Sequence, residues 1–357
     1  MTKPLFSIIT MAYCRLTFLK EALGAMFRQT YLHIEIIIVN DGAIPEVYDY
    51  ITGLEKKDNR VKIVHFKENQ YREDDPGHMN RVCLNAGLKA ATGEFVWYQS
   101  DDDLIADDYV EKMVALFESN PDCTSAAGYV KDMDSSGRFL PEGPRTTNYR
   151  PRYMPGHLLA LSTLSVNSPG IMYRAPGSIF AFKREEFIRM GGYHPFVEFS
   201  HLYGIVPFGI TGFDDTAIMY WRRHEGQLNR YETFQGYIGF ESTLGLLNDW
   251  QIQKRWEVFG KDVAKYVVQR ILDNMCLAAT DWFVTSLYCL RLKAACRLLG
   301  VLWNKKYFWF NVLRILWQEK RIIYYNLKPH IRRVIEMHRW LEGIPGIGFW
   351  AKKVNQS

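Results

Sequence analysis

Apolar residues follow two different patterns of spacing over the first 120 residues. Short, nearly unbroken apolar runs predict four β-strands, at residues 5–10, 34–41, 61–66 and 94–103. Between and after them, apolar side chains recur at helical spacing, at residues 15–30, 46–57, 77–91 and 106–120. Strands that alternate with helices of this length predict right-handed βαβ connections. We therefore expect an α/β fold, Rossmann-like, with a mainly parallel sheet and helices on both faces.

The pattern of spacing changes twice further along the chain. Residues 135–178 hold too much Pro, Gly and Arg for a core element, which predicts a long loop region over an active site. Residues 179–196 predict a strand followed by a short helix. From about residue 232 the pattern is helical to the end. We therefore expect an α/β domain at 1–231 and a helical region at 232–357.

Charge separates these two parts. Residues from 251 onward contain 19 Lys and Arg against 7 Asp and Glu, whereas residues 1–250 carry a net charge of −7. The two parts are therefore expected to face different partners. The first residues lack the features of a signal peptide, and the six cysteines show no CxxC pairing, so we expect reduced thiols in a cytosolic setting.

Carboxylates mark the ends of two predicted strands. Asp41 ends the second strand, and Asp101, Asp102 and Asp103 follow the apolar part of the fourth. In parallel sheets the carboxyl ends of strands share one edge, where ligands bind. Mg²⁺ and Mn²⁺ prefer oxygen ligands and are commonly shared between carboxylates and substrate phosphates. The alternative is a helix N-cap, but the run comes too early for the next helix. The pattern favours a divalent cation that bridges to a diphosphate.

Four stretches, in this order, resemble family 2 glycosyltransferases, which are nucleotide-sugar-dependent enzymes with the GT-A fold. They are SIITMAYCRLTFLKEAL, IEIIIVNDGA, LNAGLKAATGEFVWYQSDDDL and YWRRHEGQ, and together they span about residues 4–230. The family often has Asp-x-Asp-Asp where this chain has Gln99 at the first position. The acidic pair must then come from Asp101 with Asp102 or Asp103.

The resemblance implies a set of donor-binding residues. A nucleotide pocket after the first strand would be lined by Thr10, Ala12, Tyr13 and Arg15. Asp41 would accept a hydrogen bond from the base, and Asn80 and Arg81 would lie near the sugar or diphosphate. Arg81 could equally be a solvated helix residue. Asp101 and Asp102 would contact the nucleotide or the cation. Arg222 and Arg223 are expected to contact the diphosphate, because a guanidinium can pair bidentately with phosphate oxygens.

The resemblance also implies a metal set and a catalytic base. Mn²⁺ or Mg²⁺ would be held by Asp101, Asp103 and His224, although His224 could be an ordinary loop histidine. The base must be a carboxylate that takes the proton of the acceptor hydroxyl. Spacing slightly favours Glu198, whereas Asp214 and Asp215 look more like the acidic pair of the family.

The resemblance to this family implies an inverting glycosyltransferase. It would move a sugar from a nucleoside-diphosphate sugar, by default a UDP-sugar, to a hydroxyl of a glycan or lipid-linked acceptor in lipopolysaccharide- or capsule-type biosynthesis. A catalytically silent scaffold or glycan-binding protein of the same fold is the first alternative. A sugar nucleotidyltransferase is the second, but it normally needs a Gly-rich loop after the first strand, and residues 10–20 contain no glycine.

The C-terminal region mixes aromatic and aliphatic residues with Lys and Arg. No stretch of about 18 uncharged apolar residues occurs, so we expect no transmembrane helix. Amphipathic helices on an anionic membrane surface fit this composition, as does a helical bundle that packs on the catalytic domain or forms a homo-oligomer. Nucleic-acid binding is disfavoured, because the basic residues are interleaved with large apolar ones. We expect a cytoplasmic protein that is peripheral on the inner face of the membrane.

Overall fold

The computed structural model describes residues 3–72, 77–141, 151–164, 179–194, 200–225 and 247–288, and the single residues 75, 227, 245, 296 and 299. The chain divides into two compact units. One comprises residues 1–227 and 241–271, and the other comprises residues 228–240 and 272–357. The sheet and the candidate site lie in the first unit. The boundary expected at residue 231 falls outside the described residues and stays a prediction.

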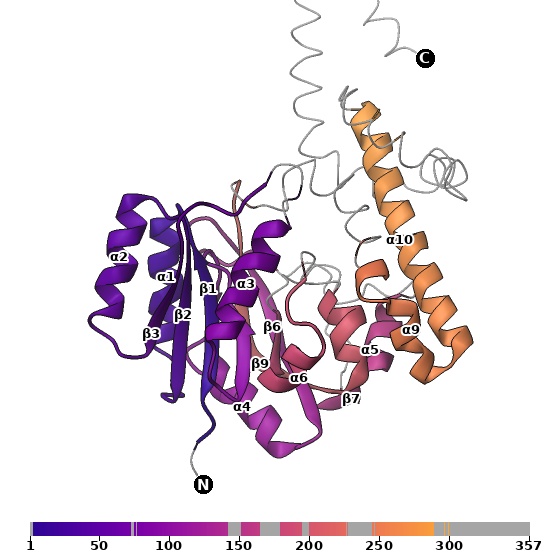
Figure 1. The fold of residues 1–357 in the computed structure, drawn as a ribbon, viewed down its shortest axis with the longest axis horizontal. Helices are drawn as coiled ribbons and strands as arrows, with labels where there is room; N and C mark the ends of the chain where they lie inside the picture. Colours follow the sequence, from indigo (N-terminus) through magenta and orange to yellow (C-terminus); the bar gives the residue numbers. More distant parts are fainter. Residues whose placement is uncertain are drawn as a thin grey trace, which may run out of the picture. The chain divides into compact units, whose positions relative to one another are not determined.

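The first half of the sheet is parallel, as predicted. Its strands are β1 (Phe6–Ala12), β2 (Ile34–Asp41), β3 (Val61–Phe66) and β4 (Phe95–Tyr98). They alternate with helices α1 (Leu16–Phe27), α2 (Pro45–Glu55), α3 (His78–Ala90) and α4 (Tyr109–Ser119). β1 lies between β2 and β4, and β3 pairs with β2 at the outer edge. All four predicted strands and all four predicted helices are found, but the fourth strand ends at Tyr98, so residues 99–103 lie after it and not within it (Figure 1).

The second half of the sheet mixes strand directions. β8 (Phe180–Lys183) is antiparallel both to β4 and to β6 (Cys123–Asp134), and β9 (Ile210–Arg223) is parallel to β6. Two short strands, β5 (Leu104–Ile105) and β7 (Tyr153–Pro155), run antiparallel to β9. The sheet order is β3-β2-β1-β4-β8-β6-β9-β5. Two reversals separate β4 from β6, so β9 runs in the same direction as β1, β2 and β4.

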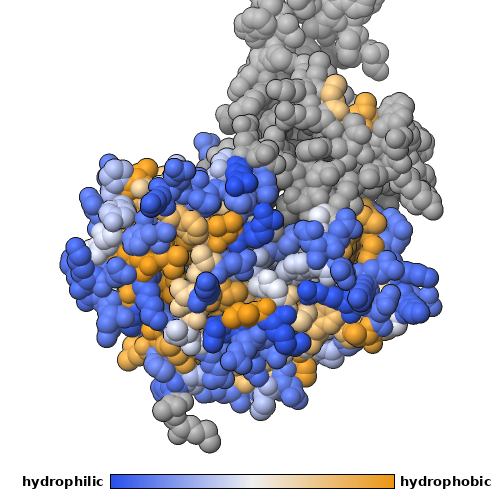
Figure 2. All heavy atoms as spheres, viewed as in Figure 1, coloured by the Kyte–Doolittle hydropathy of each residue, from blue (hydrophilic) through white to orange (hydrophobic). Residues whose placement is uncertain are grey.

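The core explains why the parallel half forms. The side chains of Ile8, Ile9 and Ile36 are fully buried, because helices cover both faces of these strands. α3 approaches β1 and β2 closely at Gly87, where an added Cβ would lie 2.6 Å from Cγ2 of Ile9. On the face shown in Figure 2 most described residues are hydrophilic, with apolar residues in smaller groups between them.

The remaining described elements are short, except one. They are α5 (Gly156–Thr163), α6 (Arg184–Arg189), the π-helix η3 (His201–Ile205), the 3₁₀-helices η4 (Val206–Phe208) and η7 (Glu257–Phe259), α9 (Ile252–Trp256) and α10 (Lys261–Tyr288). The region expected to be a loop, 135–178, contains β7 and α5. Among the residues that the structure describes, no helix is both long enough and apolar enough to cross a membrane.

Candidate functional site

The carboxyl ends of four strands meet at one edge of the sheet. Tyr13 follows β1, Asp41 ends β2, Asp101–Asp103 follow β4, and His224 follows β9. β1, β2 and β4 are adjacent parallel strands, and β9 runs in their direction. The topology thus brings residues that are far apart in the sequence to a single edge of the sheet, where α/β sheets bind their ligands.

Asp102 is the best-neutralised carboxylate of the acidic run. Its Oδ2 accepts a short hydrogen bond from Nη1 of Arg15 and lies 2.9 Å from Nε2 of His224. The same Arg15 nitrogen is 3.4 Å from Oδ1 of Asp101. Asp103 turns the other way, because its Oδ1 accepts the backbone N–H of Arg222 at 2.9 Å. The three adjacent carboxylates therefore face different partners.

Burial sets the protonation of this run. It raises the pKa of Asp101 and, with the charge of Asp102, raises the pKa of Asp103 well above the usual value. Burial works against ionisation of Asp102 as well, but the His224 hydrogen bond and Arg15 outweigh it and lower the pKa of that carboxyl group. Burial therefore outweighs the neighbouring positive charges at Asp101 and Asp103, although not at Asp102.

Arg15, predicted to line the nucleotide pocket, is partly exposed, whereas Arg222, predicted to contact the diphosphate, is buried. The Arg15 side chain is 33% exposed, whereas that of Arg222 is 1% exposed and holds Glu21 through an ion pair of 2.5 Å. Arg223 is partly buried, lies over the Trp221 ring at 3.4 Å and donates to Asp132 at 3.2 Å. Of these guanidinium groups, Arg15 has the most access to a phosphate at the edge of the sheet.

The predicted nucleotide residues after β1 and β2 differ in access. Tyr13 is 42% exposed, and its carbonyl oxygen accepts the N–H of Ile44 at 3.0 Å. Thr10 and Ala12 are fully buried in β1, so their side chains do not line the open edge.

Asp41 is also buried, and both of its carboxylate oxygens are occupied. Oδ1 accepts the N–H of Gln70 at 2.8 Å, and Oδ2 accepts Nδ2 of Asn69 at 2.9 Å. Burial nevertheless raises the pKa of this carboxyl group. In this structure Asp41 fixes the segment around Asn69 and Gln70.

Asn80 and Arg81 lie in the first turn of α3. Asn80 is partly buried, and Arg81 is exposed, with Nη2 lying 3.2 Å from Nδ1 of His78 and 3.7 Å from Oδ2 of Asp75. None of the contacts described for Arg81 reaches the acidic run.

Of the candidate bases, Asp214 and Asp215 lie away from the acidic run. Glu198 lies outside the described residues. Asp214 and Asp215 lie within β9, where its register with β6 shifts and the strand bulges. Oδ1 of Asp214 accepts the N–H and hydroxyl of Thr216, and the carbonyl of Thr216 accepts Nζ of Lys112 on α4. Asp214 therefore shapes its own bulge near α4, and the assignment of the base stays a prediction.

The metal set expected at Asp101, Asp103 and His224 is not assembled as a group. His224 pairs with Asp102, and Asp103 pairs with the backbone of Arg222. Within the described ranges, no three His, Cys, Asp or Glu side chains are placed to hold a metal ion together. Asp101 fits a cation best, because it is an oxygen donor at the edge with less positive charge around it than Asp102 has.

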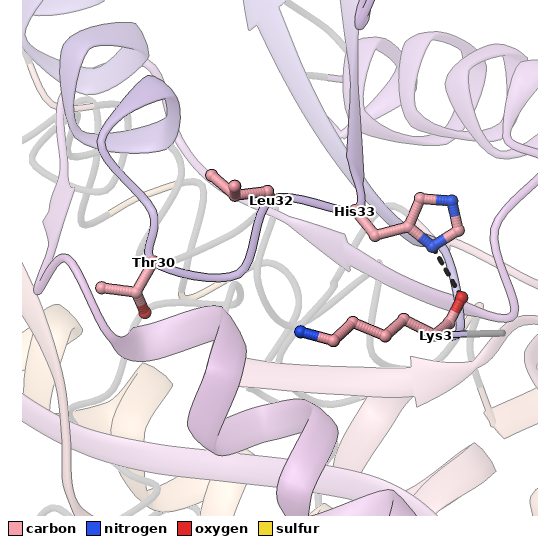
Figure 3. A pocket seen from close by; sticks show the side chains of 4 residues that line it. All are labelled: Lys3, Thr30, Leu32 and His33. Carbon is pink, nitrogen blue, oxygen red and sulfur yellow. Dashed lines mark hydrogen bonds between the residues drawn. The ribbon is translucent and has the colours of Figure 1, made fainter. Parts of the chain in front are cut away.

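A depression of about 410 Å³ lies elsewhere on this unit. It is lined by Lys3, Thr30, Leu32 and His33, with Nδ1 of His33 2.6 Å from the carbonyl oxygen of Lys3 (Figure 3). Lys3 precedes β1 and His33 precedes β2, so the depression is at the amino ends of these strands. It is at the edge opposite to the acidic run and shares no residue with it.

Sequence reasoning missed Glu21 and Phe18 on α1. The Phe18 ring centroid lies 4.7 Å from Cζ of Arg222 and 4.8 Å from the ring centroid of His224. Both α1 residues are one helical turn apart, so they share a face, but a lone glutamate on an amphipathic helix looks like a solvated residue. Only the three-dimensional pairing with Arg222 distinguishes it.

Comparison with known proteins gives one family. The profile described as "Glycosyl transferase family 2" matches residues 7–177. Among curated relatives from Bacillus subtilis, the putative glycosyltransferase EpsH is 31% identical over 39% of this chain and 38% of its own length. The putative teichuronic acid biosynthesis glycosyltransferase TuaG is 28% identical over 36% of this chain and 47% of its own length. This chain spans less than half the length of these relatives.

Solved structures share the fold at low identity. TarS of S. aureus, residues 1–349 in complex with UDP-GlcNAc, has a TM-score of 0.53 at 15% identity and covers 83% of this chain and 90% of that one. GalNAc-T7 with UDP, GalNAc and Mn²⁺ has a TM-score of 0.51 at 14% identity and covers 70% of this chain and 49% of that one. Together with the central α/β sheet, these likenesses confirm the predicted GT-A fold.

Proposed function

We propose that the protein, whose residues 7–177 match the glycosyl transferase family 2 profile, transfers a sugar from a nucleoside-diphosphate sugar to a hydroxyl group, with inversion at the anomeric carbon. The observation that carries this proposal is the acidic run Asp101–Asp103 at the edge where four strands end, with Asp101 and Asp102 paired to Arg15. The similar TarS structure is a complex with UDP-GlcNAc, which supports a UDP-sugar as the donor.

Arg15 and Tyr13 would receive the donor. Arg15 is one-third exposed beside Asp101 and Asp102, so its guanidinium can pair with phosphate oxygens without leaving the acidic run. Tyr13 is exposed next to it and can offer a ring face or a hydroxyl to the nucleoside. The segment around Asn69 and Gln70, which Asp41 holds, would complete the base side of the pocket.

Asp101, together with the donor's diphosphate, would hold a divalent cation, Mn²⁺ or Mg²⁺. Such an ion, when bound, supplies positive charge that stabilises the departing nucleoside diphosphate. The similar GalNAc-T7 structure contains Mn²⁺ together with UDP, which supports this choice. Arg15 adds a fixed guanidinium on the same side, so charge that gathers on the leaving group meets preorganised positive charge.

A carboxylate must accept the proton of the attacking hydroxyl as the bond to the sugar forms. We assign this role to Glu198, with Asp214 and Asp215 as the alternatives. The contacts of Asp214 with Thr216 and its place beside α4 favour Glu198. The acceptor would be a glycan or a lipid-linked sugar in polysaccharide biosynthesis, in keeping with the teichuronic acid biosynthesis for which TuaG is named.

The C-terminal region, residues 232–357, would bring this domain to an anionic membrane surface or to a second copy of the chain. Its excess of basic residues favours the first choice. The protein would then act in the cytoplasm, on the inner face of the membrane. Sedimentation with vesicles that contain phosphatidylserine, compared with neutral vesicles, tests this placement.

A thermal-shift screen tests the main proposal. UDP, GDP and their common sugar conjugates are added to the protein with MnCl₂ or with EDTA, and a bound nucleotide raises the melting temperature by mass action. We expect one nucleotide to stabilise the wild type with Mn²⁺ and to lose that effect with EDTA or in Asp101→Asn. Asp122→Asn, an exposed aspartate after α4, is the matched control. Equal shifts with and without Asp101 would contradict the proposed site.

Activity is then measured as nucleotide release from the stabilising sugar nucleotide. Slow hydrolysis without acceptor is expected of a transferase, whereas a silent scaffold releases nothing. Glu198→Gln should abolish release if Glu198 is the base, and Asp214→Asn and Asp215→Asn should leave it close to the wild-type rate. The reverse pattern would assign the base to β9.

A further inference from the structure

All three guanidinium nitrogens of Arg222 donate hydrogen bonds to other groups of the protein, although the place of Arg222 in the sequence suggests a contact with the diphosphate of the donor. We propose that Arg222 is a positioning residue that fixes Asp102 and Asp103 against the end of β9, and that Glu21 and Phe18 of α1 hold its guanidinium in place. This inference rests on the proposed function, because the run that Arg222 positions is the run that would meet the donor.

Arg222 contacts the acidic run twice. Its backbone N–H donates to Oδ1 of Asp103 at 2.9 Å, and its Nε donates to the carbonyl oxygen of Asp102 at 2.8 Å. One contact fixes a side chain and the other fixes the backbone of the preceding residue. The turn after β4 is therefore tied to β9 at two consecutive residues, which limits where the carboxylate of Asp102 can point.

The far end of the guanidinium is fixed by other elements. Nη1 donates to the carbonyl oxygen of Ser135 at 3.1 Å, after β6, and Nη2 donates to Oε2 of Glu21 at 2.5 Å. Phe18 covers the flat face of the group at 4.7 Å, which suits a cation–π contact. Arg222 thus joins the ends of β6 and β9, the turn after β4, and α1.

Burial separates this role from ligand binding. The Arg222 side chain is 1% exposed, and each of its three guanidinium nitrogens already donates to the protein. To reach a diphosphate it would have to leave its buried position and break its ion pair with Glu21 and its hydrogen bonds to the carbonyl oxygens of Asp102 and Ser135, which is costly. The Arg15 side chain, in contrast, is 33% exposed.

The α1 face adds a link to His224. Phe18 contacts the Arg222 guanidinium and the His224 ring, and His224 in turn lies 2.9 Å from Oδ2 of Asp102. A shift of Arg222 would therefore affect Asp102 in two ways, through the carbonyl oxygen of Asp102 and through His224. Residues that orient a ligand-binding carboxylate commonly change affinity about 10- to 100-fold when they are altered.

The experiment compares nucleotide affinity with stability. Arg222→Lys keeps the positive charge but loses the branched guanidinium group. Glu21→Gln keeps the size of the side chain but loses its negative charge, and Glu21→Asp keeps the carboxylate. The control is Glu35→Gln, which removes a buried carboxylate from a separate network of the same unit. Affinity for UDP and for GDP, each with MnCl₂, is measured by calorimetry at 10 °C (on the order of the temperature of maximum stability), and melting temperatures are measured in parallel.

We expect Arg222→Lys and Glu21→Gln to weaken nucleotide binding by about tenfold or more while remaining folded. Glu21→Asp should recover part of that loss. Glu35→Gln should melt earlier but bind as the wild type does, because it is remote from the run. This pattern separates positioning from a general loss of stability.

Other outcomes overturn the inference. Should Arg222→Lys and Glu21→Gln bind within about twofold of the wild type, Arg222 is only a structural residue. If Arg222→Lys does not fold, Glu21→Gln decides alone, since the Glu21 side chain is 45% exposed and its loss is milder. A wild type that binds neither nucleotide removes the proposed function and this inference together, whereas binding that is insensitive to Glu21 removes only the inference.

Discussion

Replacing Glu35 with glutamine should destabilise the first unit strongly, although Glu35 is far from the candidate site. Glu35 lies at the amino end of β2 and is 4% exposed. Its carboxylate accepts hydrogen bonds from Ser7, Lys62, Thr92 and Gly93, at distances from 2.5 to 3.0 Å. These donors belong to β1, β3 and the turn before β4, so one side chain joins four strands of the parallel half.

The magnitude follows from the number and type of these bonds. A hydrogen bond to a charged group contributes about 1.5–3 kcal/mol net, and desolvation of the buried carboxylate offsets part of the sum. The glutamine amide would also direct its NH₂ group at a site lined by donors. We expect Glu35→Gln to lower the free energy of unfolding by about 2–4 kcal/mol. For a unit of this size the melting temperature should then fall by about 5–12 °C.

The pH dependence gives a second, independent readout. Burial works to raise the pKa of Glu35, but Lys62, Ser7 and Thr92 outweigh it and lower that pKa in the folded state. The stabilisation is therefore fully present above the unfolded pKa, about 4.3, and is lost as the pH falls through the lower folded value. Glu35→Gln should flatten the loss of stability in acid.

Urea unfolding followed by tryptophan fluorescence, at pH 7 and pH 4, measures both effects. Glu68→Gln is a suitable control, because residue 68 is exposed and the change removes the same charge from the surface. A change below about 0.5 kcal/mol at pH 7, within the range of surface substitutions, would refute the energetic argument for Glu35.

Three further predictions concern other parts of the unit. Burial lowers the pKa of His194 to about 4 in the folded protein. Because the unfolded state binds the proton more readily, the protein should lose stability as the pH falls from about 6.5 towards 4. His194→Gln should weaken this pH dependence of the melting temperature. Gly87→Ala should cost about 1–3 kcal/mol in urea unfolding, because its Cβ would meet Ile9, whereas Gly53→Ala, with open space around it, should be neutral or stabilising. Asp102→Asn should lower the melting temperature more than Asp122→Asn, since it leaves Arg15 and His224 without their shared carboxylate.

The parallel half of the fold could be predicted because apolar residues form continuous runs in its strands and recur at helical spacing in its helices. In the second half β8 and α6 were predicted at residues 179–196, but β6 was not, because tertiary contacts override local preference there. Residues 123–134 form β6, yet Ser125, Ala126, Ala127 and Gly128 carry little strand preference. They are extended because β8 and β9 pair on either side, and Gly128 is needed where an added Cβ would lie 2.3 Å from the carbonyl oxygen of Ala217.

The edge of the sheet at which the candidate site lies was predictable, but the hydrogen bonds and ion pairs among its residues were not. Asp41 and the acidic run could be placed at one edge, because each follows a strand of the same parallel sheet. The pair between Glu21 and Arg222 spans 201 positions of sequence. Periodicity places Glu21 on the exposed side of α1 and says nothing of a partner on β9, so Arg222 was interpreted as a ligand for phosphate.

Gln99 shows how charge limits this site. It is fully buried, its N–H donates to the carbonyl oxygen of Ile9, and its Nε2 donates to the carbonyl oxygen of Asp103 at 2.9 Å. A carboxylate at this position could not donate that second bond. It would also add a fourth acid to a run in which burial already raises the pKa of Asp101 and Asp103. The amide at position 99 therefore lets the three carboxylates that follow stay close together without a fourth negative charge beside them.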